Sequence, residues 1–156
     1  MLIQLEDFPQ HSLERPIVLT GGSFDLFHLG HAEFLKQCKS YGKTLVVQLA
    51  SDKYVQSKKG PKRPILNEVE RATLLSYLRF VDYVFISDAR CESKEVIEVI
   101  KPDILVLSDE NKEEKENYLK QSLGKAPDTI QVVFVPAKTD FNRVSTSSLI
   151  EKIKAL

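Results

Sequence analysis

Five short runs of apolar, mostly branched residues recur along the chain, and they constrain its fold more than any other feature. They are PIVLT (16–20), TLVVQLA (44–50), VDYVFI (81–86), DILVL (103–107) and IQVVFV (130–135). The runs are continuous rather than alternating, which is typical of strands covered on both faces, as in parallel sheets. Helical patterns fill the intervals between them. The sequence therefore predicts an α/β fold with an open, doubly wound sheet of about five parallel strands and helices on both faces.

Helix signals fall between these runs, and several come with start or stop residues. Asn67-x-x-Glu70 has the spacing of a capping box, and Ser93 stands where a helix cap would, with Pro102 as the stop. The charged stretch 109–124 predicts a helix that ends at its glycine. Apolar spacing predicts two more helices, one after the first strand and one near residue 150, from the residues Ala32, Leu35, Cys38, Leu149, Ile150 and Ile153.

Length and charge bound the organisation of the chain and its partners. A chain of 156 residues can bury one core, and we expect one domain at residues 16–156 behind an N-terminal extension, 1–15, that serves for packing or as a dimer arm. Its 22 basic residues balance 22 acidic ones, so no overall field favours nucleic acid or an anionic membrane. We therefore expect neither a nucleic-acid nor a membrane partner.

Neither metal ligands nor targeting signals stand out in the sequence. Cys38 and Cys91 are too few and too far apart for a zinc site, so we expect reduced thiols and no metal site made of protein ligands. The first residues include acidic side chains and Pro9, where a signal peptide needs a basic end and an apolar stretch. No run reaches the roughly 18 apolar residues of a membrane span. These observations predict a cytoplasmic location.

The segment GGSFDLFHLGH, residues 21–31, follows the first strand and is the first candidate site. In open parallel sheets, ligands bind beyond the carboxyl ends of the strands, where the strand order reverses. Gly21 and Gly22 let the backbone turn and approach a ligand without a Cβ, and Gly30 lies where the next helix begins. A helix start offers unpaired N–H groups and a partial positive charge, and His28 and His31 add donors. The segment is neither a G-x-G-x-x-G fingerprint nor a P-loop.

Two further segments suit an anion. QSKKGPKRP, residues 56–64, holds four cations within six positions, and its glycine and prolines predict a loop rather than a helix face. RVSTSSLIEKI, residues 143–153, has successive hydroxyls ahead of an apolar stripe, which is typical of a helix cap and hence of an anion site. Taken alone, the first is more simply a solvated turn and the second a plain cap. Three such elements at strand-to-helix junctions together favour a polyphosphate ligand.

Five motifs in one order, spread over about residues 16–154, resemble the cytidylyltransferase-like nucleotidyltransferases. They are Gly22-Ser-Phe-Asp-x-x-His28-x-Gly-His31, Lys59-Gly60-x-x-Arg63-Pro64, Asn67-x-x-x-Arg71, Arg79-Phe-Val-Asp82 and Ser145-Thr146-Ser147. The resemblance implies a single-domain Rossmann-like enzyme, commonly a homodimer. It also implies a reaction in which an acceptor phosphate attacks the α-phosphorus of a nucleoside triphosphate, pyrophosphate leaves, and Mg²⁺ accompanies the phosphates.

The resemblance also implies roles for individual residues. His28 and His31 would hold the reacting phosphates, and Lys59 would neutralise charge on the acceptor or α-phosphate, which makes these three the candidate catalytic residues. A helix start disfavours an imidazolium, so we expect His31 to act as a neutral donor. The candidate nucleotide-binding residues, which would grip the β- and γ-phosphates or shape the cleft, are Gly21, Gly22, Ser23, Phe24, Gly30, Arg63, Asp109, Arg143, Ser145, Thr146 and Ser147.

The choice between CTP and ATP stays open. Arg79-Phe-Val-Asp82 resembles the cytidylyltransferases that act on alcohol phosphates and leans slightly to CTP, whereas the ungapped stretch 59–64 resembles the heptose-phosphate adenylyltransferases. Ser108-Asp109 replaces a frequent Gly-Asp pair, and Asp140 stands where several cytidylyltransferases have arginine. The sequence predicts transfer of a nucleoside monophosphate from CTP or ATP to a small alcohol or sugar phosphate. A non-catalytic nucleotide-binding regulator is the alternative, against which the histidine pair argues.

Overall fold

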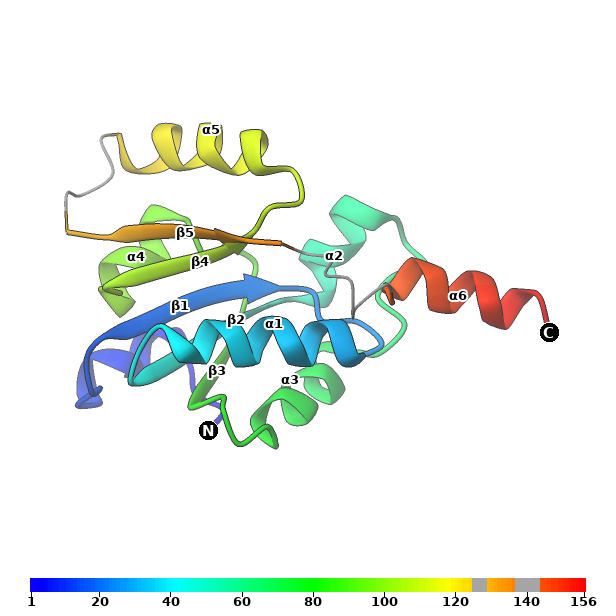
Figure 1. Ribbon diagram of the computed structural model, residues 1–156, viewed down its shortest axis with the longest axis horizontal. Helices are drawn as coiled ribbons and strands as arrows, with labels where there is room; N and C mark the ends of the chain where they lie inside the picture. The colour runs from blue at the N-terminus through cyan, green and yellow to red at the C-terminus, as the bar shows by residue number, and fades with distance from the viewer. Residues whose placement is uncertain (125–128, 137–143) are drawn as a thin grey trace.

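The computed structural model is a five-stranded parallel sheet with helices on both faces, and it describes residues 1–124, 129–136 and 144–156 (Figure 1). The strand order is β3-β2-β1-β4-β5, and every neighbouring pair is parallel. The chain adds β2 and β3 on one side of β1 and then crosses to place β4 and β5 on the other. The strand order therefore reverses between β1 and β4, which confirms the predicted doubly wound, Rossmann-like fold.

The strands lie within two residues of their predicted limits. They are β1 (Ile17–Gly22), β2 (Thr44–Ala50), β3 (Tyr83–Ser87), β4 (Ile104–Ser108) and β5 (Gln131–Val135). All 7 residues of β2 are buried, as expected for a strand with neighbours on both edges and helices on both faces.

The described residues form one 3₁₀ helix, η1 (Leu5–Gln10), and six α-helices, which are α1 (Leu29–Ser40), α2 (Asp52–Lys59), α3 (Glu68–Ser76), α4 (Lys94–Ile100), α5 (Lys112–Leu123) and α6 (Thr146–Lys154). The predicted capping box is present at α3, where Asn67 accepts from the Glu70 backbone and Glu70 accepts from the Asn67 backbone. Ser93 caps α4 as predicted, by accepting from the Val96 backbone. These local signals therefore fixed where two helices begin.

One segment that we expect to be a loop is partly helical. Residues 56–59 belong to α2, which the sequence reading leaves out. Ser51 caps this helix by accepting from the Tyr54 backbone, and Lys58 and Lys59 lie in its last turn, where cations suit the helix dipole. Gly60, with φ of 90°, ends the helix. The glycine and prolines therefore mark only the part of the segment that follows Lys59.

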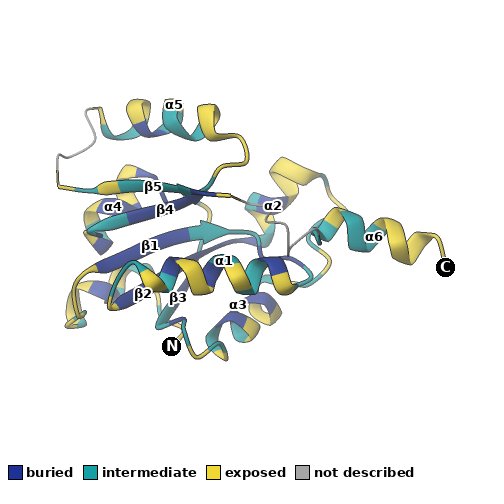
Figure 2. Ribbon diagram, viewed as in Figure 1, coloured by how far each residue is buried: buried dark blue, intermediate teal, exposed yellow. Residues whose placement is uncertain are grey.

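Two apolar cores lie on opposite faces of the sheet (Figure 2). Alternate residues of β1 divide between them, with Val18 in one core and Leu19 in the other. Helices α1 and α3 cover the first face through Leu35, Cys38 and Leu75 among others. Helices α4 and α5, with η1, cover the second. The two-sided burial explains why the strands read as continuous apolar runs.

The N-terminal residues 1–15 pack against the edge of the sheet. Leu2 bridges Val84 in parallel, so this segment partly covers the free edge of β3. Phe8, which is 3% exposed, meets the rings of Tyr83 and Phe85 edge-on, with centroids 5.8 and 5.5 Å away. Arg15 pairs with Asp103 at 2.6 Å. Of the two roles expected for this segment, packing is the one these contacts describe.

No helix among the described residues is long and apolar enough to cross a membrane.

Candidate active site

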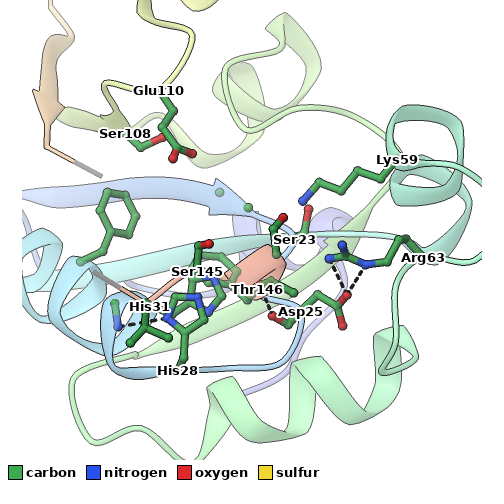
Figure 3. Close-up of a pocket in the computed structure, with 17 residues that line it drawn as sticks. Ser23, Asp25, His28, His31, Lys59, Arg63, Ser108, Glu110, Ser145 and Thr146 are labelled. Carbon is green, nitrogen blue, oxygen red and sulfur yellow. Dashed lines mark hydrogen bonds and ion pairs between the residues drawn. The ribbon is translucent and has the colours of Figure 1, made fainter. Parts of the chain in front are cut away.

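A cleft of about 480 Å³ opens at the carboxyl ends of β1 and β4, where the strand order reverses. This volume lies in the usual range of ligand pockets. Loop 23–28, the first turns of α1 and α6, and the end of α2 form its walls (Figure 3). The lining residues are Gly21, Gly22, Ser23, Phe24, Asp25, His28, Gly30, His31, Phe34, Lys59, Arg63, Ser108, Glu110, Val144, Ser145, Thr146 and Ser147. The three segments predicted to bind phosphate therefore meet in one cleft.

Loop 23–28 is held in an unusual backbone conformation. Phe24 and Leu26 both have φ of 46°, in the left-handed region, which costs bulky residues about 1–3 kcal/mol each. Two bonds to loop carbonyls fix it: Arg71 Nη1 donates to Ser23 O at 2.6 Å, and Thr146 Oγ1 donates to Asp25 O at 2.7 Å. The strained loop sets the position from which α1 begins.

The two histidines stack face to face at the start of α1. Their ring centroids are 3.8 Å apart, with an interplanar angle of 21°. His28 is the N-cap, and its Nδ1 accepts from the Gly30 backbone at 3.1 Å, so a neutral His28 carries its proton on Nε2. His31 packs against Phe24 and Phe27, with centroids 5.4 and 5.6 Å away. Both imidazoles are thus oriented by packing before any ligand binds.

Burial keeps both imidazoles neutral. It lowers the pKa of His28, and, together with the neighbouring His28 and Lys59, it lowers the pKa of His31 to about 3. The buried Nδ1 of His31 has no hydrogen-bond partner among the described residues. At neutral pH His31 therefore offers an uncharged ring, which agrees with the expectation of a neutral donor.

The cations of segment 56–64 divide between the cleft and the solvent. Lys59 and Arg63 line the cleft, with Lys59 at its exposed mouth, whereas Lys58 and Lys62 are exposed and are not among the lining residues described. Burial and the nearby Arg63 lower the pKa of Lys59. The solvated-turn interpretation therefore holds for two of the four cations only.

Asp25 anchors the chain that carries Arg63. Its carboxylate, 1% exposed, accepts from Arg63 Nε at 2.9 Å and from the Ile65 and Leu66 backbones at 3.0 and 3.1 Å. Burial would raise the pKa of Asp25, but these backbone bonds and Arg63 lower it. In the sequence Asp25 stands only as part of the first motif, with no role predicted for its side chain. Its partners lie about 40 positions away, so only the folded chain brings them together.

Arg71 is a second support residue of the loops, and it is fully buried. Its guanidinium donates to the carbonyls of Ser23, Leu66 and Ala50 and pairs with Asp52 at 2.7 Å. Two loop carbonyls and the last carbonyl of β2 thus converge on one charge. The sequence marks Arg71 only as the end of the motif Asn67-x-x-x-Arg71, and none of these contacts is predicted from it.

Helix α6 presents its start to the cleft. Ser145 and Ser148 form a capping box, and Ser145, Thr146 and Ser147 line the cleft as the sequence predicts. Capping uses the Ser145 side chain to satisfy the Ser148 backbone at 3.1 Å. The other N–H groups of the first turn remain suited to an anion.

Gly21 serves packing as well as the cleft. A Cβ at this position would lie 2.4 Å from Gln48 Oε1 and 2.8 Å from Cys91 Cβ. Glycine is therefore required here by the packing of Gln48 and Cys91 against the end of β1.

Two of the predicted nucleotide-binding residues, Asp109 and Arg143, are not among the lining residues that the structure describes. The cleft is lined by Ser108 and Glu110, on either side of Asp109, while Asp109 is not among the lining residues that the structure describes. Successive residues after a strand can point in different directions, which a residue pattern does not resolve. Arg143 lies outside the described residues. Glu110, Ser108 and Phe34 line the cleft without having been predicted to do so. Ser108 was marked only as a departure from a Gly-Asp pair, and no motif marks the other two.

A charge cluster lies behind the floor of the cleft. Arg90 donates to Glu92 at 2.7 Å and to Glu114 at 2.8 Å, and its guanidinium lies 4.5 Å from the centroid of the Tyr118 ring. Lys115 Nζ donates to the carbonyl and the hydroxyl of Ser108, both at 2.7 Å. Glu114, Lys115 and Tyr118 belong to α5, so the two cations tie this helix to the end of β4 and to the loop after β3.

A parallel sheet with cations and two helix starts at its switch point defines a nucleotide-binding α/β protein of the Rossmann-like class. Comparison with known proteins narrows this class. Residues 19–152 match the cytidylyltransferase-like family, and the chain belongs to that family. It is 41% identical to the FAD synthase of Thermococcus sibiricus over 136 residues, which cover 87% of this chain and 90% of that protein. The chain is thus a nucleotidyltransferase, as its motifs predict.

In the other comparisons, the match spans a smaller share of the relative's own length or the sequence identity is lower. The chain is 39% identical to the bifunctional protein HldE of Helicobacter pylori over 98% of its residues, but spans 31% of that protein. Among solved structures, a lipopolysaccharide core biosynthesis protein from Thermoplasma volcanium superposes with a TM-score of 0.63 at 29% identity, covering 79% of this chain and 98% of that one. A pantoate-beta-alanine ligase from Francisella tularensis, at 12% identity and a TM-score of 0.64 over 100% of this chain and 78% of that one, shares the fold.

Proposed function

We propose that this nucleotidyltransferase transfers the adenylyl group of ATP to a small phosphorylated acceptor and releases pyrophosphate. The observation that carries the proposal is the convergence of the His28–His31 pair, Lys59 and the start of α6 on one cleft. Cations, neutral donors and helix N–H groups together suit a triphosphate better than a single phosphate.

Two likenesses support ATP over CTP. One relative, matched over 90% of its own length, is an FAD synthase, and FAD contains an adenylate joined to a flavin phosphate. The stretch 59–64 resembles the heptose-phosphate adenylyltransferases, and part of HldE is similar to this chain throughout. The slight lean to CTP rested on Arg79-Phe-Val-Asp82 alone. Both relatives are compatible with a flavin or sugar phosphate as acceptor.

The proposed chemistry needs no covalent enzyme intermediate. An oxygen of the acceptor phosphate attacks the α-phosphorus, the bond to the β-phosphate oxygen breaks, and that oxygen keeps the electron pair. His28 and His31, as neutral donors, would stabilise the charge that grows on the reacting phosphates. Lys59 would hold the acceptor and α-phosphate together, and Ser145, Thr146 and Ser147 would orient the leaving pyrophosphate. Catalysis would then arise from positioning and charge stabilisation.

Mg²⁺ is expected to enter with the nucleotide, as part of the substrate. No group of three or more His, Cys, Asp or Glu side chains in the described part of the chain could hold a metal ion. Asp25 is already committed to Arg63 and two backbone donors, which leaves Glu110 as the other carboxylate of the lining. Mg²⁺ usually keeps several waters and binds through substrate phosphates and one or two carboxylates, so this lining fits such an ion.

The proposal is tested by pyrophosphate release from ATP or CTP with riboflavin 5′-phosphate, a hexose 1-phosphate and glycerol 3-phosphate as acceptors. We expect release with ATP and at least one acceptor. His31→Gln should lower turnover on the order of 10²–10³-fold, as the loss of a preorganised donor does, while nucleotide still raises the melting temperature. A clear preference for CTP, or His31→Gln turnover close to that of the unmodified protein, would contradict the proposal.

A further inference from the structure

Asp25 is bonded through both its side chain and its backbone, and the two bonds lead to different walls of the cleft. Its carboxylate accepts from Arg63 Nε at 2.9 Å, on the wall that also carries Lys59. Its carbonyl accepts from Thr146 Oγ1 at 2.7 Å, at the start of α6. Figure 3 shows both contacts as dashed lines that meet at this residue. Asp25 therefore joins the wall proposed to hold the acceptor phosphate to the wall proposed to hold the triphosphate.

The backbone around Asp25 is tightly fixed. Phe24 and Leu26, the residues on either side, both have φ of 46°, a conformation that persists in bulky residues only where surrounding contacts impose it. The Asp25 side chain is 1% exposed, and Arg71 holds the carbonyl of the nearby Ser23 at 2.6 Å. Because neither group of Asp25 has room to reorient alone, a shift at its carboxylate is passed to its carbonyl.

The hydroxyl of Thr146 is already in use in this arrangement. A threonine hydroxyl has one proton to donate, and here that proton goes to the Asp25 carbonyl rather than toward a ligand. No residue of α6 is buried, and among the described residues no other hydrogen bond ties α6 to the rest of the chain. Thr146 therefore fixes the position of the first turn of α6, whose backbone N–H groups remain suited to phosphate.

Arg63, at the other end of the connection, keeps donors for a ligand. Its Nη2 lies 2.8 Å from an Asp25 carboxylate oxygen, which is the distance of an ion pair, but in the described part of the chain it makes no well-directed hydrogen bond. A guanidinium carries several N–H donors, and Arg63 lines the cleft. An anion that binds Arg63 from the cleft therefore acts directly on the carboxylate of Asp25.

We propose that Thr146 and Asp25 are positioning residues that couple the two sides of the cleft, so that nucleotide bound at the start of α6 tightens binding of the phosphorylated acceptor. The first ligand orders the connection from Thr146 through Asp25 to Arg63, and the second ligand then meets a chain that is already ordered. The coupling is reciprocal, so the acceptor tightens nucleotide binding by the same factor. This inference rests on the proposed function.

Amide hydrogen exchange at Ile65 and Leu66 tests the connection without an acceptor. Both N–H groups donate to the Asp25 carboxylate. Saturating α,β-methylene ATP, an analogue that cannot release pyrophosphate, should slow their exchange about tenfold, which is a typical strength of coupling between sites. The Leu45 N–H donates to the Asp82 carboxylate at the far end of the sheet, so its exchange measures any general stabilisation by the analogue.

Variants of α6 show whether the effect passes through the Thr146 hydroxyl. Thr146→Val keeps the shape of the side chain and removes the donor, so the analogue should still bind but should no longer slow exchange at Ile65 and Leu66 beyond its effect at Leu45. Thr146→Ser keeps the hydroxyl and should restore the slowing. Ser147→Ala, which removes the neighbouring hydroxyl, is the matched control and should retain the slowing at saturating analogue. Circular dichroism establishes that each variant is folded.

Titration calorimetry measures the coupling itself. The analogue is titrated into the protein alone and with saturating riboflavin 5′-phosphate, a hexose 1-phosphate or glycerol 3-phosphate. At least one acceptor should tighten analogue binding about tenfold in the unmodified protein and leave it nearly unchanged in Thr146→Val. Equal analogue affinity with and without all three acceptors would overturn the coupling. A hydroxyl that instead contacts phosphate directly would make Thr146→Val weaken analogue binding equally with and without acceptor.

Pyrophosphate release separates this inference from the proposed function. Slowed exchange at Ile65 and Leu66 in a protein that releases no pyrophosphate with any acceptor would refute the proposed function and leave the connection supported. Pyrophosphate release in a protein whose two amides do not respond to the analogue, or respond equally in Thr146→Val, would overturn the connection and leave the proposed function standing.

Discussion

At the scale of single residues, the cleft depends on groups whose ordinary chemistry is changed by burial. His31 lies between Phe24, Phe27 and His28, and this packing keeps its ring neutral at a pH where an exposed imidazole begins to charge. Such a ring can donate a hydrogen bond to phosphate without adding a charge that must be neutralised when the product leaves.

The pKa of His31 predicts a dependence of stability on pH. Because the pKa is about 3 in the folded protein and 6.5 is the ordinary value, the unfolded chain takes up a proton as pH falls through 6.5 while the folded chain does not. Stability from the neutral ring is fully present above pH 6.5 and is lost as pH falls toward 3, by about 1.4 kcal/mol per unit. We expect the free energy of unfolding, measured with urea, to fall between pH 7 and pH 5 in the unmodified protein. This fall should be about 2 kcal/mol larger than the fall over the same pH range in His31→Gln. Equal losses would contradict a buried neutral His31.

At the scale of secondary structure elements, the cleft is assembled by cross-connections between helices and loops. Asp25 holds the chain after α2, Thr146 holds the start of α6, and Arg71 gathers the carbonyls of Ser23, Ala50 and Leu66. Arg90 and Lys115 hold α5 from behind. The bonds of Asp25 to Ile65, of Thr146 to Asp25 and of Arg71 to Ser23 join elements that are remote in sequence.

Arg90 is expected to act on the cleft without lining it. Arg90→Gln removes the partner of the buried Glu92 and should lower the free energy of unfolding by about 3 kcal/mol, the usual cost of breaking a buried ion pair. It should also raise the KM for nucleotide, since α5 would no longer be tied to the loop behind Gly21, while kcat changes little.

Arg90→Lys keeps the charge but not the fork geometry of the guanidinium, so it should restore only part of the stability and of the nucleotide affinity that Arg90→Gln loses. Glu114→Gln removes the exposed partner that Arg90 holds on α5, so it should raise the nucleotide KM with a smaller loss of stability. An unchanged nucleotide KM in a destabilised Arg90→Gln variant would limit Arg90 to stability.

At the scale of the whole molecule, the N-terminal residues behave as part of the domain. Phe8→Ala removes a ring that is 3% exposed and should cost about 3–5 kcal/mol in urea unfolding, as large core truncations do. Phe8→Leu retains most of the apolar volume and should cost less. Turnover of the folded fraction should not change, because Phe8 lies in the core of the sheet face shared with α4 and not in the cleft. A Phe8→Ala variant as stable as the unmodified protein would show that residues 1–15 are an appended arm.

The sequence carries most of the fold because its signals are local. Apolar runs, the Asn67 and Ser145 caps and the glycine-rich turn each act within a few residues, so each can be read in isolation. The end of α2 was misread because its glycine and prolines follow the helix rather than replace it. Asp109 was preferred to Glu110 for a similar reason: both follow β4, and only the path of the backbone decides which one faces the cleft.

By itself, the sequence determined the alternation of strands and helices, the carboxyl edge of the sheet as the binding edge, and the residue types able to hold a polyphosphate. Only the tertiary structure decided how deeply His31 is buried and hence how far its pKa falls, that Asp25 and Arg71 hold the loops, and that no residue of α6 is buried. The division has a physical cause. Hydrogen bonding and helix capping act between near neighbours in the chain, whereas burial, electrostatic coupling and surface complementarity arise between residues that only folding brings together.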